Sequence, residues 1–199
     1  MTYDLTRRLV LGGLSGGLAV AALPAAAISS AEAEVLVQRV VADINAVINS
    51  GKSERAMYAD FERIFRRYGD VGVIARATLG PDARRASRAQ MREFSEAFAG
   101  YLARKYGKRF REFVGGQVTV MGARQVKNYS EVFTTVNLRG QSPFEVRFRV
   151  SDRSGKDLFF DMVIEGISLG KTERTEIGAL LDRNRGDIDA MIAALKTRG

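Results

Sequence analysis

Apolar residues in the first half of the chain recur at the spacing of helices. From about residue 31 to residue 49 they fall three and four positions apart, which predicts an amphipathic helix. Ser53 is placed to cap a second helix, which Tyr68-Gly69-Asp70 ends. A short helix then runs from Val71 to Ala77 and ends at Leu79-Gly80-Pro81. The first half of the chain is therefore predicted to be helical.

A longer helix is predicted to start at Ser87, because Gln90 lies three positions later and completes a capping box. Its apolar face is mainly aromatic: Met91, Phe94, Phe98, Tyr101, Leu102 and Tyr106. Ordinary core packing explains such a face in most proteins.

Beyond Gly115-Gly116 the apolar pattern changes from helical spacing to alternation, which is typical of strands with one buried face. The predicted strands span about residues 118–121, 132–138, 144–150 and 158–164, and helical spacing returns after Gly166. An apolar strand face must be covered by other elements. The sequence therefore predicts an α+β fold, with helices packed on one face of a curved antiparallel sheet of about four strands.

The first 27 residues have the pattern of a secretory signal peptide. Arg7 and Arg8 precede an apolar run from Leu9 to Leu23, and Ala25-Ala26-Ala27 offers small residues for cleavage. The run is glycine-rich and shorter than the roughly 20 apolar residues of a spanning helix. We predict a cleaved signal over residues 1–27, a single domain over 28–199 and a periplasmic location. Both the general secretory route and the twin-arginine route fit this signal, and cleavage after Ala33 is the second choice.

Composition removes several function classes. The 199 residues include no histidine and no cysteine. Ser-His-Asp and Cys-His catalysis and disulfide bonds are thereby excluded, and a zinc site would have only carboxylate ligands. We predict no metal and no cofactor.

The chain is basic, with a formal net charge of +8, which becomes +7 without residues 1–27. Arg84, Arg88 and Arg92 would line one helix face, and Lys105, Lys108, Arg109 and Arg111 form a second cluster. Export makes nucleic acid an unsuitable partner. A solvated face, an anionic lipid surface and an acidic partner protein all remain open.

Two separated segments and the tail resemble the MlaC family of periplasmic phospholipid-binding proteins, also called toluene-tolerance auxiliary proteins. The first segment comprises Tyr68-Gly69-Asp70, Ile74-Ala75-Arg76, Leu79-Gly80, Ala86-Ser87, Phe94, Phe98 and Tyr106. The second comprises Asp161 and Ile164-Glu165-Gly166-Ile167-Ser168-Leu169, and the tail runs from Gly186 to Leu195. Tryptophans that are frequent in the family are replaced by Ala83 and by Asp157 or Leu158.

The resemblance implies a monomeric carrier that buries phospholipid acyl chains in an apolar cavity between helices and sheet. It further implies shuttling between a lipid complex of the outer membrane, whose lipid asymmetry such transport maintains, and an inner-membrane ABC transporter complex. Residues expected to line the cavity are Val73, Ile74, Phe94, Phe98, Tyr101, Tyr106, Phe133, Phe148, Phe160 and Met162. Tyr101 and Tyr106 could place a hydroxyl near its mouth.

Three other functions remain open at this point. The same fold could carry a hopanoid or sterol-like lipid. A carboxylate such as Asp161 or Glu165 could serve an enzyme, and a structural envelope protein would need no lipid at all.

Overall fold

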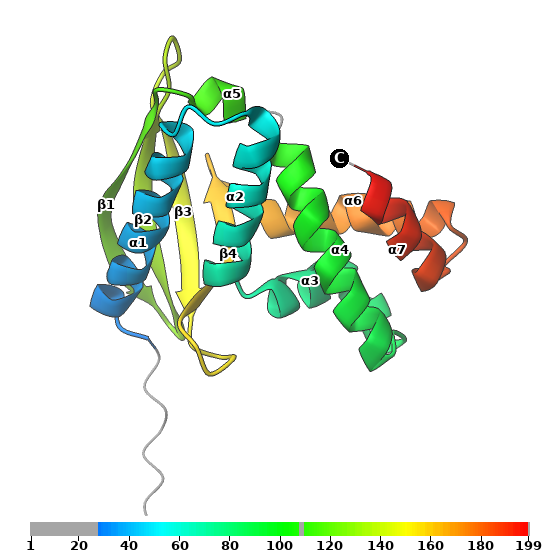
Figure 1. The fold of residues 1–199 in the computed structure, drawn as a ribbon. Coiled ribbons are helices and arrows are strands. Elements are labelled where there is room, and N and C mark those ends of the chain that lie inside the picture. Colours follow the sequence, from blue (N-terminus) through cyan, green and yellow to red (C-terminus); the bar gives the residue numbers. More distant parts are fainter. Residues whose placement is uncertain (1–27, 108–109, 199) are drawn as a thin grey trace, which may run out of the picture.

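The computed structural model describes residues 28–107 and 110–198, and Figure 1 shows the order of the elements. The predicted signal peptide, Lys108 and Arg109 lie outside the described residues. The helices are α1 (Ser30–Ile48), α2 (Glu54–Tyr68), α3 (Val71–Leu79), the 3₁₀ helix η1 (Gly80–Arg84), α4 (Arg88–Gly107), α5 (Phe110–Phe113), α6 (Leu169–Arg183) and α7 (Ile188–Thr197). The strands are β1 (Gln117–Val126), β2 (Tyr129–Asn137), β3 (Phe144–Ser151), β4 (Leu158–Ile164) and β5 (Ile167–Ser168).

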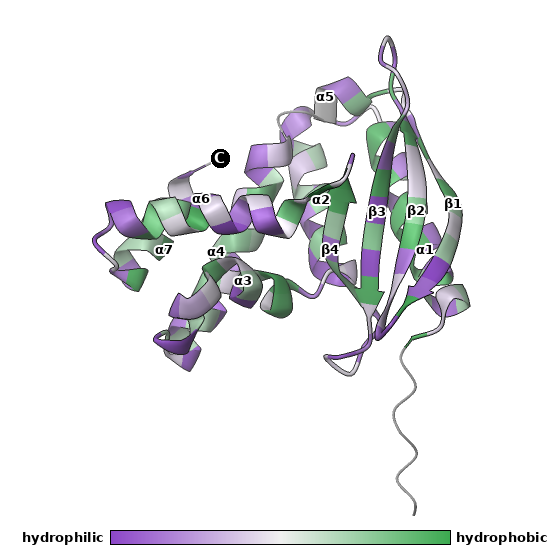
Figure 2. Cartoon of the chain, turned by 180° about the vertical axis from the view of Figure 1, so that it is seen from behind, coloured by the Kyte–Doolittle hydropathy of each residue, from purple (hydrophilic) through white to green (hydrophobic). Residues whose placement is uncertain are grey.

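The strands form one antiparallel meander in the order β1-β2-β3-β4-β5. Helices α1 and α2 lie over one face of this sheet, and α3, α4, α6 and α7 form a helical group beside it (Figure 1). From the opposite side, no described helix lies in front of β1, β2 and β3 (Figure 2). The predicted α+β fold is therefore confirmed, with a two-residue fifth strand in addition.

The start signals read from the sequence are met with one exception. The Ser87 hydroxyl accepts from the amide of Gln90 at 3.1 Å, and the Gln90 side chain accepts from the amide of Ser87 at 2.9 Å. Ser53 lies at the N-cap of α2, but its side chain makes no capping hydrogen bond within the described residues. The second half of β1 was missed because a register shift between Val120 and Gly122 interrupts its alternation.

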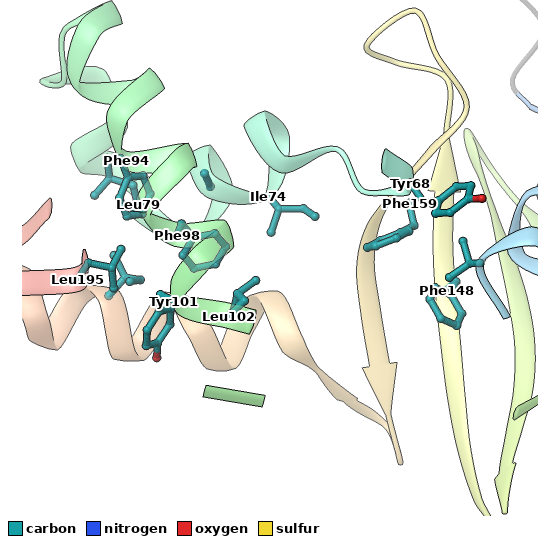
Figure 3. Close-up of a cluster of buried hydrophobic side chains, with 14 of the residues drawn as sticks. Tyr68, Ile74, Leu79, Phe94, Phe98, Tyr101, Leu102, Phe148, Phe159 and Leu195 are labelled. Atoms are coloured by element: carbon teal, nitrogen blue, oxygen red, sulfur yellow. The ribbon is translucent and has the colours of Figure 1, made fainter. Parts of the chain in front are cut away.

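The helical group has a densely packed interior that is continuous with the core against the sheet. Phe94, Phe98 and Leu195 are fully buried where α4 packs against α3 and α7. Figure 3 shows these side chains among the helices, apart from Phe148 and Phe159 on the strands. The buried side chains among the helices and those on the strands thus belong to one continuous hydrophobic core.

The outer face of the sheet carries a buried carboxylate surrounded by arginines. Glu131 is 3% exposed, and its oxygens lie 2.7 Å from Arg124 and 3.1 Å from Arg149. A third guanidinium, that of Arg147, lies 3.8 Å away, and the ring of Phe133 lies beneath Arg124 at 5.2 Å. This cluster joins three strands without a covering helix.

Acidification should weaken the sheet through Glu131. Burial alone would raise the pKa of Glu131, but its bonds to Arg124 and Arg149 outweigh burial and hold that pKa below its ordinary value. The carboxylate therefore contributes stability that is complete above the unfolded-state pKa and is lost as pH falls through the lower folded-state pKa. Glu131→Gln should lower the unfolding free energy at neutral pH by about 1–3 kcal/mol. Urea unfolding from neutral pH to about pH 3 should then show a flatter pH dependence than the wild type. If the unfolding free energies of the variant and the wild type depend equally on pH, Glu131 is not the group that causes the loss of stability in acid.

Candidate functional site: an apolar cavity between the sheet and the helices

A cavity of about 380 Å³ lies between the helix-covered face of the sheet and the helices above it. The strands contribute side chains from alternate positions, so that one face of each strand points inward. On the sheet side the lining consists of Val118, Thr134, Val136, Phe144, Val146, Phe148, Phe159, Met162 and Ile164. The hydroxyl of Thr134 donates to the Val146 carbonyl at 2.7 Å, so this polar side chain presents no unpaired donor to the cavity.

Helices α1 and α2 form the opposite wall. Phe61, Ile64 and Phe65 of α2 recur at i, i+3 and i+4 and line the cavity together, with Val40 and Ile44 of α1 beside them. Asn45 fixes α1 to the edge strand, because its side chain donates to the Val118 carbonyl at 2.9 Å and accepts from the Val118 amide at 3.0 Å. This reciprocal pair closes the side of the cavity along β1.

The last two turns of α4 and the start of α6 form the third wall. Leu102, Ala103 and Tyr106 line the cavity from α4, and Leu169 lines it from α6. The Tyr106 hydroxyl donates to buried Glu173, which thereby ties α4 to α6. Burial and the neighbouring Glu173 carboxylate raise the pKa of Tyr106, which therefore stays protonated.

The cavity reaches solvent at one end. Its lining includes three exposed polar residues, Glu112, Gln141 and Glu165, which come from α5, the β2–β3 connection and the turn after β4. Every other lining residue except Thr134 and Tyr106 is apolar. The site is an apolar cavity whose solvent-exposed end, the mouth, is polar. It is suited to an apolar ligand that keeps a polar group in water.

The sequence profile of the MlaC protein family matches residues 36–197, which is most of the chain. This chain belongs to the MlaC family. Its fold is similar to that of a phospholipid-binding protein from Ralstonia solanacearum, solved in complex with a phospholipid. That match has a TM-score of 0.70 at 19% identity and covers 82% of this chain and 94% of the other. The family resemblance seen in the sequence is therefore confirmed.

Three of the ten residues predicted from the MlaC resemblance line the chamber: Tyr106, Phe148 and Met162. Ile74 and Phe98 instead line a second, separate space of about 10 Å³, together with Met162. A space of that volume holds roughly one water molecule. These two residues lie behind the wall of the main cavity.

Four further predictions on the helices are corrected. Phe94 and Tyr101 are 0% and 2% exposed and pack in the core of the helical group, so neither lines the cavity (Figure 3). Only the last two turns of α4 reach the cavity, because its earlier turns are enclosed by α3 and α7. Val73 is 42% exposed and points away from the core. The Tyr106 hydroxyl was expected near the mouth, but it donates a hydrogen bond to buried Glu173 instead.

Two predictions on the strands are corrected as well. Phe133 pairs with Arg147 and lies on the outer face, beneath the arginines around Glu131. Phe160 is the extra residue of a β-bulge, since Arg149 pairs with Asp161 but Val150 pairs with Phe159. The bulge turns Phe159 toward the cavity and leaves Phe160 edge-on against the outer-face ring of Tyr129.

Phe159 is the main lining residue that sequence reasoning missed, together with the row of Phe61, Ile64 and Phe65. The i, i+3, i+4 spacing of that row was visible in the sequence, but nothing in it showed that this helix face covers the sheet. Strict alternation, by contrast, gave no signal for Phe159, because only the pairing register reveals the bulge.

Gly69 of the family motif allows the chain to pass close to the cavity wall. A Cβ at this position would lie 2.7 Å from the Phe65 carbonyl oxygen and 2.9 Å from the Phe159 ring. Gly69→Ala should therefore lower the unfolding free energy by about 1–3 kcal/mol through overpacking. Gly178→Ala, at a helical glycine where a Cβ meets nothing within 4 Å, is the matched control. Chemical unfolding of both variants measures the difference, and equal stability would contradict the close approach.

The carboxylates considered for catalysis have other roles in this geometry. Asp161 accepts hydrogen bonds from the Ser168 hydroxyl at 2.8 Å and from the Gly170 amide at 3.0 Å, and it pairs with Arg149 at 3.1 Å. It anchors the start of α6 against β4. Glu165 follows β4 in a turn with a φ of 47° and lies at the cavity mouth.

In residues 28–107 and 110–198, no group of three or more acidic side chains is arranged to hold a metal ion. No helix in that part of the chain combines the length and hydropathy needed to cross a bilayer.

Proposed function

We propose that this member of the MlaC family is a periplasmic carrier that holds phospholipid acyl chains in the cavity between α1, α2, α4 and the sheet. The single observation that carries the proposal is the chamber of about 380 Å³ with an almost wholly apolar lining. Its size falls in the range of about 300–1,000 Å³ that small-molecule sites occupy. The phospholipid in the structural neighbour from Ralstonia solanacearum supports the same ligand class.

The physical need for such a chamber follows from the cost of wetting hydrocarbon. Each exposed methylene costs about 0.8 kcal/mol, so a chain of about 16 carbons costs on the order of 12 kcal/mol in water. A carrier must remove most of that surface from solvent. The apolar walls do so, while Glu112, Gln141 and Glu165 at the mouth leave room for a polar headgroup in water.

Export is the second part of the proposal. Ile28 is 3% exposed, its carbonyl accepts from the Ser130 hydroxyl at 3.1 Å, and Ser29 caps α1 through Glu32. Cleavage after Ala33 would remove this anchor and this cap. We therefore infer cleavage before Ile28, which leaves the domain of residues 28–199 intact in the periplasm.

The carrier would exchange lipid with a complex at the outer membrane and with an ABC transporter complex at the inner membrane, as the family resemblance implies. Membership in the MlaC family favours such binding and transport over catalysis.

Extraction of the purified protein with organic solvent, followed by mass spectrometry, tests the ligand class. We expect a phospholipid in near-stoichiometric amount. A hopanoid or sterol-like lipid would replace the proposed ligand with the alternative one, and the absence of any lipid would overturn the proposal in favour of a structural role.

A further inference from the structure

A cluster of arginines lies at the end of the helical group that carries α3, η1 and the start of α4. We call this surface the basic end and define it as Arg76, Arg84, Arg85, Arg88 and Arg92. All five side chains are exposed. Residues 76–92 contain these five arginines and one acid, Asp82, a net charge of +4 in 17 residues, which is half the +8 of the whole chain.

The positive charge of the basic end is mostly unpaired. Asp82 lies 2.8 Å from Arg85, while the other four arginines make no ion pair with any residue of 28–107 or 110–198. Arg85 also reaches the Gly186 carbonyl at 3.4 Å, so the α6–α7 turn lies beside it. Residues 182–189 around that turn carry Arg183 and Arg185 against Asp182, Asp187 and Asp189 and therefore do not add to the positive charge.

Apolar side chains are exposed among these arginines. Val73 is 42% exposed on α3, one helical turn before Arg76, and Ala77, Pro81 and Ala89 are exposed as well. Exposed apolar residues between cations suit the interface of an anionic bilayer, which offers both negative headgroups and a hydrocarbon boundary.

The basic end and the cavity mouth lie at opposite ends of α4. Arg88 is the first residue of this 20-residue helix; Tyr106, near its other end, lines the cavity, and α5, which carries Glu112 of the mouth, lies beyond that same end (Figure 1). The rise of an α-helix separates the two ends by about 30 Å. A membrane that contacts the basic end is therefore far from the mouth.

We propose that the basic end binds the surface of a membrane that contains anionic phospholipid and holds the protein there with its cavity mouth directed away from that surface. Binding is electrostatic and depends on salt, and it does not require a ligand in the cavity. The basic end thus tethers the protein to a bilayer without exchanging lipid with it.

Vesicle co-sedimentation tests the tether. We expect wild-type protein to bind phosphatidylcholine vesicles that contain phosphatidylglycerol, and not vesicles of phosphatidylcholine alone. Raising the salt from about 0.1 M to about 1 M shortens the Debye length from about 10 Å to about 3 Å and should abolish binding. The triple variant Arg84→Gln/Arg88→Gln/Arg92→Gln should bind roughly 100-fold more weakly, since each basic residue near an anionic surface contributes about fivefold.

A second triple variant, Arg39→Gln/Arg55→Gln/Arg153→Gln, is the matched control. It removes the same charge from exposed positions on α1, α2 and the β3–β4 connection. All three proteins are purified in the same form, so residues 1–27 cannot account for a difference between them. The control should bind like the wild type and show the same lipid content by extraction as both other proteins.

Three results would overturn the tether: no wild-type binding to anionic vesicles, equal loss in both triple variants, or binding that survives in Arg84→Gln/Arg88→Gln/Arg92→Gln. Capture of an acidic protein by the basic end, with no vesicle binding, would likewise replace the membrane with a different partner. Lipid extraction separates these outcomes from a failure of the carrier proposal, since the arginines do not line the cavity.

Discussion

Filling the cavity should remove the bound lipid without unfolding the protein. Ala103→Phe and Val146→Phe place two rings on different walls, one on α4 and one on β3, inside a space of about 380 Å³. Added rings compete with acyl chains for the same volume. We expect the double variant to retain at most a tenth of the wild-type lipid, measured by native mass spectrometry.

The stability of the same variant gives a second readout. A substitution that overpacks a filled core destabilises it by about 1–3 kcal/mol, whereas a ring that enters a void gains contacts there. We therefore expect the midpoint of thermal unfolding of the lipid-free protein to be unchanged or higher. Val35→Phe/Ala89→Phe makes the same two substitutions at exposed positions and is the control. Full lipid content in the cavity variant, or a large loss of stability, would contradict the assignment of this space to ligand.

Removing the Phe98 ring should have the opposite effect to filling the cavity: a large loss of stability and little direct effect on the ligand site. Phe98 is 0% exposed, and its ring centroid lies 5.6 Å from that of Phe94 and 6.1 Å from that of Tyr101. Phe98→Ala should lower the unfolding free energy by about 3–5 kcal/mol, as for other phenylalanines in packed cores. Urea unfolding measures this change.

Phe133→Ala is the natural comparison, because both residues were predicted from the sequence to line the cavity. Phe133 is only half-buried on the outer face and lies beneath the guanidiniums of Arg124 and Arg147. Its loss should cost about 1–2 kcal/mol. Equal costs for the two variants would mean that Phe98 is not part of a solid core.

The fold was largely predictable because its elements have strong local signals. The Ser87–Gln90 capping box and the alternation in β2, β3 and β4 depend on neighbours in sequence, and the structure contains all of them. The family could also be recognised from the sequence, because its motif residues have local structural roles that fix their identity. Gly69 permits a close backbone approach, and Asp161 holds the first turn of α6.

The lining of the cavity was harder to predict, because it depends on which face of each element meets the sheet. An aromatic row on α4 has the same pattern whether it packs against helices, as Phe94 does, or reaches a cavity, as Tyr106 does. Because of a single β-bulge, Phe159 lines the cavity and Phe160 lies on the outer face of the sheet. Periodicity fixes which residues share a face, but it does not identify the partner of that face or a break in register.

A crystal structure of the protein saturated with phospholipid would show whether the cavity holds the acyl chains. We expect acyl-chain density between Phe65 of α2 and Phe148 of β3, with the headgroup at the mouth beside Glu165. Lipid bound elsewhere, with this cavity empty or closed by its own side chains, would contradict this expectation.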